Sequence, residues 1–422
     1  MARIRVALKK TQLDLAIAMG YSSSLIGNYE NGRCPVSADV LIAFRQETHM
    51  TDVPITDSEV EAMKNELRAW NDTVTYGDIK LAAELYHILA RRVRWSYDTG
   101  LQTLFDLFCT KYYFRLGKKD EYDRLFVALS KMEDGLDGEL LYWYYCLCGF
   151  CYHTQWRYKQ ALAMYFKAEA VGNRLHVNDR ALYYNIGSCL INCGYPYLAV
   201  MNFEKFQVYK YDLASVRLGF ATQKLLAIGY SKIGKTNKAI QMLNDCREYV
   251  TNNKSDDNPT LYEIYFSLGK VFHEAGDYDK AHENLNKASH YCNKNDESYV
   301  EYLCYAATFF REYNKTDKAI ECLNKCIPLV AKGTLWYEWL HALKHSVTLD
   351  DKASADYMVW TAIPALHEYG MCTVVMKCFD WLSKHYEEKG MYKPALKYAN
   401  EASNIFYMLM KGNLALLRIV AN

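Results

Sequence analysis

Polar and basic side chains gather in residues 9–33 in a pattern that suits hydrogen bonding to a nucleic acid. The amide of Asn28 can donate and accept at once, which matches the adenine edge in the DNA major groove. Serine hydroxyls can bond base edges or phosphates, and lysine and arginine bind phosphates. The alternative is that the serines only cap a helix and face solvent; for Ser22, capping is the preferred interpretation. The candidate DNA-binding residues are Lys9, Lys10, Gln12, Ser22, Ser23, Ser24, Asn28 and Arg33.

Two short helices joined by a tight turn would position these side chains. Apolar residues recur at spacings of three and four, first before Gly20 and again after Ser22. Gly20 ends the first predicted helix, Ser22 is placed to cap the second, and Asn31-Gly32 stops the second. This is the helix-turn-helix pattern, in which the second helix enters the major groove. The apolar positions are Leu13, Leu15, Ala16 and Met19 in the first helix and Leu25, Ile26 and Tyr29 in the second.

The same segment resembles the Xre/Cro-like helix-turn-helix domains over roughly residues 3–48. The resemblance implies that Gln12 and the start of its helix lie against a phosphate. It also implies that the helix after Ser22 reads DNA and that Val40–Phe44 belong to a closing helix. One departure is Lys9-Lys10, which replaces the family's glycine turn and leaves the path of the first helix open. The matching residues are Thr11-Gln12, Ala16, Gly20, Ser22, Ile26, Tyr29-Glu30-Asn31-Gly32 and Pro35.

A period of about 38–40 residues governs the chain after residue 56. Its clearest unit runs from Tyr262 to Ala288, with two amphipathic stretches joined by Gly276-Asp277, and it resembles the tetratricopeptide repeat. Weaker units begin at Gly77 and Lys119, and the unit near Tyr357 is degenerate. About eight or nine helical hairpins are expected to stack into a superhelix with a concave inner face. Small residues mark the helix crossings at Ala161, Ala199, Ala239, Ala281, Ala319 and Ala395.

The repeat register predicts which side chains face that concave surface. Asn185 stands out, because in peptide-binding tetratricopeptide proteins an asparagine at this repeat position often holds a peptide backbone. The alternative is an ordinary exposed or inter-helix polar residue. His153 and His273 are expected to be groove or packing residues. The candidate peptide-binding residues are Tyr184, Asn185, Ser188, Asn192, Lys224, Ile228, Glu263, Phe266, Lys270, Glu301, Tyr305 and Arg311.

No pattern of catalytic or metal-binding residues emerges from the sequence. The 14 cysteines lie in strongly helical stretches without paired Cys-x-x-Cys spacing, so buried reduced thiols are expected and zinc is not. Nucleophile–base motifs, glycine-rich phosphate loops and carboxylate clusters are not evident, so we expect neither an enzyme nor a cofactor. With no signal peptide and no apolar run long enough to span a bilayer, a cytoplasmic protein is expected.

Length and charge favour a small basic domain on a large neutral one. The chain has 422 residues, more than one compact core needs. Residues 1–50 contain six basic and four acidic residues, whereas the formal net charge of the whole chain is +1. We expect an all-α protein, with a helix-turn-helix domain at 1–50, a linker at 51–56 and a right-handed tetratricopeptide-type α-solenoid at 57–422. Thr56 and Glu59 supply a capping box for the first solenoid helix.

This domain order resembles the Rap/Rgg/NprR/PlcR/PrgX group of peptide-sensing regulators. The resemblance implies a homodimer that binds a double-stranded DNA operator and a short signalling peptide, without a membrane. The peptide would occupy the concave face and change the spacing of the two heads. The alternative is a DNA-localised scaffold whose solenoid binds a protein partner. The apolar C-terminal run within Pro394–Val420 is either a capping helix or a dimer contact, and capping with dimer contacts nearby is preferred.

Overall fold

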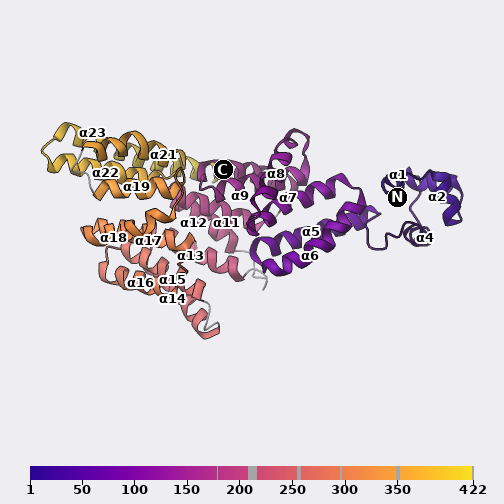
Figure 1. The fold of residues 1–422 in the computed structure, drawn as a ribbon, viewed down its shortest axis with the longest axis horizontal. Coiled ribbons are helices and arrows are strands. Elements are labelled where there is room, and N and C mark those ends of the chain that lie inside the picture. The colour runs from indigo at the N-terminus through magenta and orange to yellow at the C-terminus, as the bar shows by residue number, and fades with distance from the viewer. Residues whose placement is uncertain (178, 208–215, 254–257, 295–296, 348–351, 421–422) are drawn as a thin grey trace. The chain divides into compact units, whose positions relative to one another are not determined.

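The computed structural model describes residues 1–177, 179–207, 216–253, 258–294, 297–347 and 352–420, and within these ranges every regular element is helical (Figure 1). The predicted all-α class is therefore confirmed. The chain divides into two compact units. The first contains Met1–Leu147 and Ala170–His176, and the second contains Cys148–Glu169, Val177–Tyr211 and Val216–Asn422.

The first unit begins with α1 (Ala2–Ala7), α2 (Gln12–Met19), α3 (Ser23–Glu30) and α4 (Ala38–Thr48) and continues with α5 (Asp57–Tyr76), α6 (Ile79–Ser96), α7 (Thr99–Arg115), α8 (Lys119–Ser130) and the 3₁₀ turn η1 (Glu133–Gly135). At the division of the units lie α9 (Gly138–Thr154) and α10 (Tyr158–Leu175). The second unit continues with α11 (Arg180–Cys193), α12 (Pro196–Gln207), α13 (Val216–Lys232), α14 (Thr236–Asn253), α15 (Asn258–Glu274), α16 (Tyr278–Tyr291), α17 (Glu297–Glu312), α18 (Thr316–Cys326) and η3 (Ile327–Leu329). It ends with α19 (Leu335–Val347), α20 (Lys352–Tyr357), the π-helix η4 (Met358–Ala362), α21 (Ile363–Glu368), α22 (Cys372–Glu388) and α23 (Tyr392–Val420).

The head, residues 1–55, has a small apolar core of its own. Leu15 and Ala16 of α2 and Ile26 of α3 pack with Ile4 and Phe44, all of them buried. The prediction that Leu13 belongs to the buried face of α2 is wrong, because its side chain is 57% exposed. The helix is only eight residues long, so Leu15 and Ala16 suffice to reach the core and Leu13 lies outside that stripe.

The predicted helix ends in the head are confirmed. Thr11 and Asp14 form a capping box at the start of α2, and Gly20 ends this helix in the left-handed conformation. The hydroxyl of Ser22 accepts a hydrogen bond from the backbone N–H of Leu25 at 3.3 Å, so Ser22 caps α3. These local contacts fix the angle between the two helices.

The segment between the head and α5 is packed rather than loose. Val53 and Ile55 are buried in the apolar core of the head. Thr56 and Glu59 form the predicted capping box of α5, and Glu59 also pairs with Arg45 of α4. The start of α5 is thus joined to the head by both apolar and ionic contacts.

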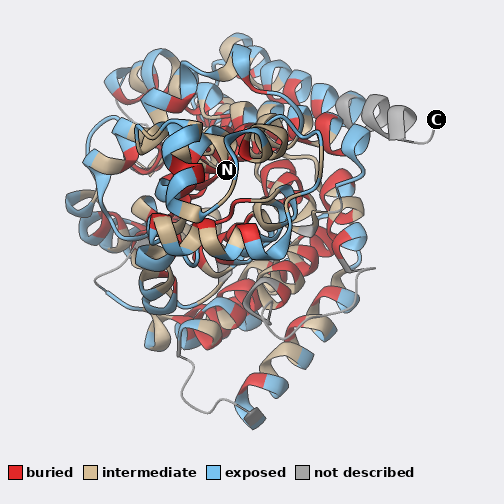
Figure 2. Ribbon diagram, turned by 90° about the vertical axis from the view of Figure 1, so that its right-hand side faces the viewer, coloured by how far each residue is buried: buried red, intermediate tan, exposed pale blue. Residues whose placement is uncertain are grey.

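Within the second unit, consecutive helices pack as hairpins, and their facing sides are the buried ones (Figure 2). All six alanines that define the predicted repeat are buried, with Ala161, Ala239 and Ala281 completely inaccessible. Glycines on the facing helices allow the same close approach. A Cβ atom on Gly149 would lie 2.4 Å from the ring of Tyr165, and one on Gly187 would lie 2.5 Å from the ring of Phe203.

The repeat near Tyr357 is irregular, as predicted. In place of one second helix, the chain forms α20, the π-helical turn Met358–Ala362 and then α21. Pro364 lies in the first turn of α21, where it has no N–H to offer to the preceding turn. The side chain of Leu366 is nevertheless fully buried, so this unit still contributes to the core.

Candidate functional site

The first helices of successive hairpins in the second unit line one pocket, here called the central pocket. Its volume is about 430 Å³, and its lining comes from α11, α13, α15, α17, α19 and α22 together with the turn before α10. In a repeat protein the first helices form the inner wall, so residues distant in sequence are brought together there. The space suits a short peptide or a small ligand.

Most of the sequence-predicted groove residues lie in this lining. They are Tyr184, Ser188, Asn192, Lys224, Ile228, Lys270, Glu301 and Tyr305.

The other four predicted groove residues lie beside the central pocket, not in its lining. Asn185 is half-buried on α11, next to Tyr184. Glu263 reaches the lining only through its ion pair with Lys224, at 2.9 Å. Phe266 lies beneath the Lys270 ammonium, 3.9 Å from the ring centroid. Arg311 lies over the Trp381 ring, at 4.6 Å.

Lysine–glutamate pairs connect neighbouring inner helices. Lys224 of α13 pairs with Glu263 of α15, and Lys270 of α15 pairs with Glu301 of α17 at 3.0 Å. Burial alone would lower the pKa of Lys224, but the negative charge of Glu263 outweighs it and raises that pKa. Burial would likewise raise the pKa of Glu301, and the charge of Lys270 reverses this and lowers it. Lys224 and Glu301 are therefore charged at neutral pH.

A second network joins α15, α17 and α22. One ring nitrogen of His273 lies 2.7 Å from the Tyr305 hydroxyl, and the other lies 2.9 Å from the Glu312 carboxylate. Lys377 of α22 donates to the same carboxylate at 2.8 Å. Burial acts to raise the pKa of Glu312, but the His273 hydrogen bond and the Lys377 charge hold it at about 2. Because Glu312 stays anionic, it fixes Lys377 at the edge of the central pocket.

His153 takes a different role from His273. Its ring lies 3.2 Å from the Ser188 hydroxyl, and burial lowers its pKa to about 4. The imidazole is thus neutral and packs behind the groove-lining Ser188. This agrees with the expectation of a packing residue.

Four tryptophans also contribute to the lining of the central pocket. Trp336 and Trp339 stack on α19 with centroids 5.8 Å apart, and Trp381 lies on α22. Trp156, from the turn between α9 and α10, meets the Trp336 ring edge-on at 4.9 Å. None of these four residues was predicted from the sequence. The lining therefore combines lysine–glutamate pairs with tryptophan rings.

Trp156 occupies a position that glycine holds in other repeats. It precedes Ala161 by five residues, just as Gly194, Gly234 and Gly276 precede the alanines of their own repeats. All of these positions have positive φ, and for Trp156 φ is 62°. A side chain with a Cβ atom is disfavoured there, and such strain persists where the residue has a role. The register of the repeats would have revealed this tryptophan.

Replacing Trp156 separates the backbone strain from the ring contact. Trp156→Gly and Trp156→Ala both lose the contact with Trp336, but only alanine keeps a Cβ atom at positive φ. We expect the glycine variant to be more stable than the alanine variant by about 1 kcal/mol in urea unfolding. An alanine variant as stable as the glycine variant would contradict the account of strain at this turn.

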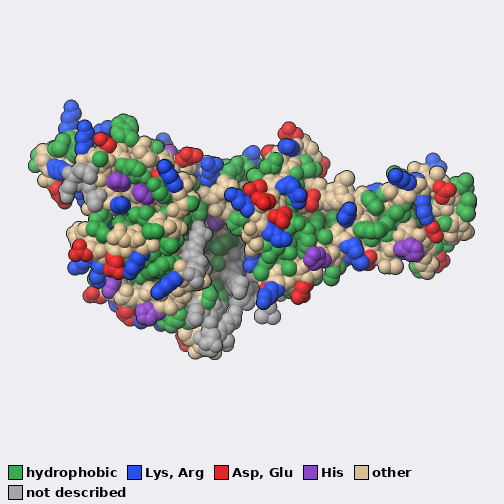
Figure 3. Space-filling view, viewed as in Figure 1, with side chains coloured by type: hydrophobic (Ala, Val, Ile, Leu, Met, Phe, Trp, Pro, Cys, Tyr) green, Lys and Arg blue, Asp and Glu red, His purple; other side chains and the backbone are tan. Residues whose placement is uncertain are grey.

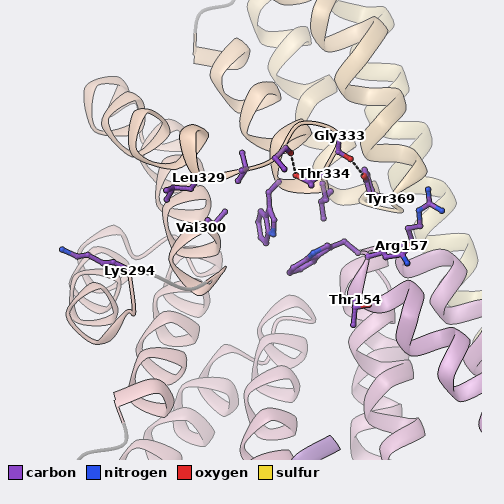
Figure 4. A pocket seen from close by; sticks show the side chains of 14 residues that line it. Thr154, Arg157, Lys294, Val300, Leu329, Gly333, Thr334 and Tyr369 are labelled. Atoms are coloured by element: carbon purple, nitrogen blue, oxygen red, sulfur yellow. Dashed lines mark hydrogen bonds between the residues drawn. The ribbon is translucent and has the colours of Figure 1, made fainter. Parts of the chain in front are cut away.

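Beyond the pair Trp156 and Trp336 lies a second cavity, of about 850 Å³ (Figure 4). Arg157, Thr154 and Tyr369 lie along one side of it, and Lys294, Val300 and Leu329 lie along the other. The Tyr369 hydroxyl donates to the carbonyl of Gly333 at 3.0 Å, which fixes the loop before α19. The two cavities share Trp156, Leu335 and Trp336, so the tryptophan pair lies between them.

In the head, the candidate DNA-binding residues lie on α2, on α3 and in the turns beside them. Ser23, Ser24, Lys9 and Arg33 are exposed, and Asn28 is half-buried on α3. Lys9 itself has a φ of 56°, which makes the turn where a glycine was expected. Charged side chains alternate with apolar ones on the face of the head seen in Figure 3.

Gln12 and Lys10 are bound by acidic side chains of the head. The amide of Gln12 donates to Glu30 at 2.8 Å, and Lys10 pairs with Glu47 at 2.5 Å. Arg5 holds the same Glu30 by two hydrogen bonds of 2.7 and 2.8 Å. Burial acts to raise the pKa of Glu30, but these two partners lower it overall. The network of Arg5, Gln12 and Glu30 ties α1, α2 and α3 together.

Two absences hold for the described part of the chain. No group of three or more histidine, cysteine, aspartate or glutamate side chains there could hold a metal ion. Of the helices in those residues, none is long and apolar enough to cross a membrane.

Comparisons with known proteins agree with this architecture. The tetratricopeptide repeat family matches residues 220–290. The chain is 22% identical over 401 residues to the transcriptional activator NprA of Geobacillus stearothermophilus, covering 89% of this chain and 95% of that protein.

Solved structures show the same fold. A Rap protein complexed with competence and sporulation factor matches 83% of this chain and 99% of its own, with a TM-score of 0.72 and 16% identity. NprR in complex with its cognate peptide NprX matches 82% of this chain and 99% of its own, with a TM-score of 0.68 and 18% identity. The apo form of NprR from B. thuringiensis has a TM-score of 0.61, covers 82% of this chain and 99% of its own, and is 17% identical. The chain thus has the helical-repeat fold seen in these Rap and NprR structures.

Proposed function

We propose that this protein is a sequence-specific DNA-binding regulator whose second unit binds a short signalling peptide. The observation that carries the proposal is the central pocket, where residues from six inner helices converge on a space of about 430 Å³. The similarity of the chain to a transcriptional activator supports the same function, as do the cognate peptide bound by NprR and the competence and sporulation factor bound by Rap.

The head is the proposed DNA reader. The exposed side chains of Ser23 and Ser24 begin α3, and Asn28 follows one turn later. Lys9 and Arg33 flank this helix as exposed cations suited to phosphates. Gln12 would contact a phosphate only if its amide left Glu30, so its role is the more structural one.

The packed segment between the head and α5 suggests how the two activities are coupled. Two kinds of contact would make α5 and the head move together. Val53 and Ile55 are buried in the core of the head, and Arg45 of the head pairs with Glu59 of α5. A peptide that binds two arrangements of the repeats with different affinity would shift their populations. Paired heads must match half-sites about 34–36 Å apart, so small displacements change operator affinity.

Selection from a pool of random DNA duplexes tests the reader directly. The full-length chain is expected to enrich a defined motif with two half-sites, because paired heads would bind it. Retention of duplexes with no common motif would contradict sequence-specific binding.

We further propose that the chain forms a homodimer through α23. Tyr392, Leu396, Phe406 and Tyr407 on this helix are 56–72% exposed, which is unusual for large apolar side chains. The side chains from Gly412 onward, including the apolar C-terminal run, lie outside the described residues. A monomer in sedimentation experiments would instead favour a scaffold that covers this helix with a protein partner.

A further inference from the structure

Lysines outnumber glutamates on the wall of the central pocket. Lys224, Lys232, Lys270 and Lys377 line it, whereas only Glu274 and Glu301 do so among the acidic residues. The remaining partners of these lysines, Glu263 and Glu312, lie outside the lining. Each of these lysines has a carboxylate partner beside it, so the charges balance although the lining contains more ammonium groups than carboxylates.

Two of these lysines lie at the same end of the pocket. Lys232 pairs with Glu274 at 2.9 Å, and Lys377 pairs with Glu312 at 2.8 Å. Glu312 is also bound by His273, and His273 directly precedes Glu274 on α15, so the two ion pairs meet on neighbouring residues of that helix. Their side chains are 33% and 42% exposed. An ammonium has three N–H donors, so each lysine retains donors beyond its glutamate bond.

A buried hydroxyl faces the same pocket. Ser231 lines the pocket and is only 7% exposed, yet among the described residues its hydroxyl has no hydrogen-bond partner. A buried polar group without a partner costs free energy, and a bound ligand atom would relieve this cost. Ser231 and Lys232 are the last two residues of α13, and both line the central pocket.

We propose that a carboxylate of the peptide ligand binds at the end of the central pocket formed by Lys232, Lys377 and Ser231. The inference rests on the proposed peptide-binding function. The ammonium groups supply charge-assisted hydrogen bonds, and the tryptophans of the lining receive the apolar side chains next to the carboxylate. Glu274 competes with the ligand for Lys232, so it tunes the affinity downward. The carboxylate is either the C-terminus of the peptide or an Asp or Glu side chain.

Four pools of synthetic octapeptides, rich in aromatic and aliphatic residues, test this proposal with the full-length chain. The first pool is amidated and has no Asp or Glu; the second is the same with a free C-terminus. The third is amidated with one Asp or Glu, and the fourth is amidated with one Lys or Arg. Retention is measured by equilibrium filtration and mass spectrometry. We expect the second or the third pool to be retained at least tenfold more than the first and the fourth. Retention of the second pool would identify the C-terminus as the source of the carboxylate, and retention of the third would identify an Asp or Glu side chain.

Substitutions of opposite sign separate binding from folding. Lys377→Met is expected to lower retention of the preferred pool at least tenfold, whereas Glu274→Gln is expected to raise it. Damage to the fold would not produce such a gain. Lys384→Met removes an exposed lysine of the same helix that does not line the pocket, so retention should stay unchanged.

The results that overturn the proposal are also distinct. Equal retention of the first pool, or preference for the fourth, excludes a carboxylate site while peptide binding stands. If no pool is retained, the proposed peptide-binding function fails together with this inference.

Discussion

Glu30→Gln is expected to destabilise the head by roughly 3–5 kcal/mol, because it leaves the Arg5 guanidinium buried without its counter-charge. The Glu30 and Arg5 side chains are only 4% and 14% exposed, so solvent compensates little. Native-state hydrogen exchange of the α2 and α3 amides measures the change without unfolding the repeats. A decrease below about 1 kcal/mol would contradict the assigned role of this pair.

The matched control is Glu47→Gln. The pair of Lys10 and Glu47 is about one third exposed at both side chains, so we expect a loss of stability below about 1 kcal/mol.

The contribution of Glu30 to the stability of the head depends on pH with a definite sign. Because the pKa of Glu30 is lowered from 4.5, its stabilisation is complete above that value and is lost as pH falls through the folded-state pKa. Wild type and Glu30→Gln should therefore converge in acid.

Asn28→Ala combined with Ser24→Ala is expected to remove the preference for the operator over unrelated DNA. A bidentate contact from asparagine to adenine contributes about 1–3 kcal/mol of discrimination, which corresponds to a factor of roughly 5–150. Binding to unrelated DNA should persist, because it depends on the cations. Competition titrations with specific and unrelated duplexes give both values.

Arg33→Ala provides the contrast to that double variant. It is expected to weaken binding to all duplexes alike and to reduce the dependence of affinity on salt, as a phosphate contact does. An unchanged sequence preference in the Asn28 and Ser24 double variant would show that α3 is not the reader.

The local structure of the head follows closely from its sequence. Gly20 and Ser22 carry the predicted signals for termination and capping, and the structure confirms both; the capping box of Thr11 was not predicted. The burial pattern of α2 was harder to predict. Leu13 and Ile17 are as apolar as Leu15, yet they are 57% and 70% exposed. In a helix of eight residues the apolar periodicity is too short to fix the buried face.

The repeats show what a register can and cannot predict. Counting from the buried alanines correctly indicated the helix crossings and most of the pocket lining. The same spacing recurs in the last repeat. Lys377 and Trp381 lie as many residues before Ala395 as Glu301 and Tyr305 lie before Ala319. The contact of Trp156 with Trp336 was not predictable in this way. It joins residues that are 180 positions apart, and no local pattern encodes such a distance.

The most direct test of the central claim is operator binding in the presence of peptides. Full-length protein is titrated against DNA fragments from its own gene neighbourhood, with and without short peptides encoded immediately beside the gene. The account predicts specific binding to one fragment and a change in that affinity of at least tenfold caused by one of the peptides at about micromolar concentration. Specific binding that none of these peptides alters would contradict the peptide switch and favour a protein partner for the repeats. Absence of specific binding would contradict the assignment of the head as a DNA reader.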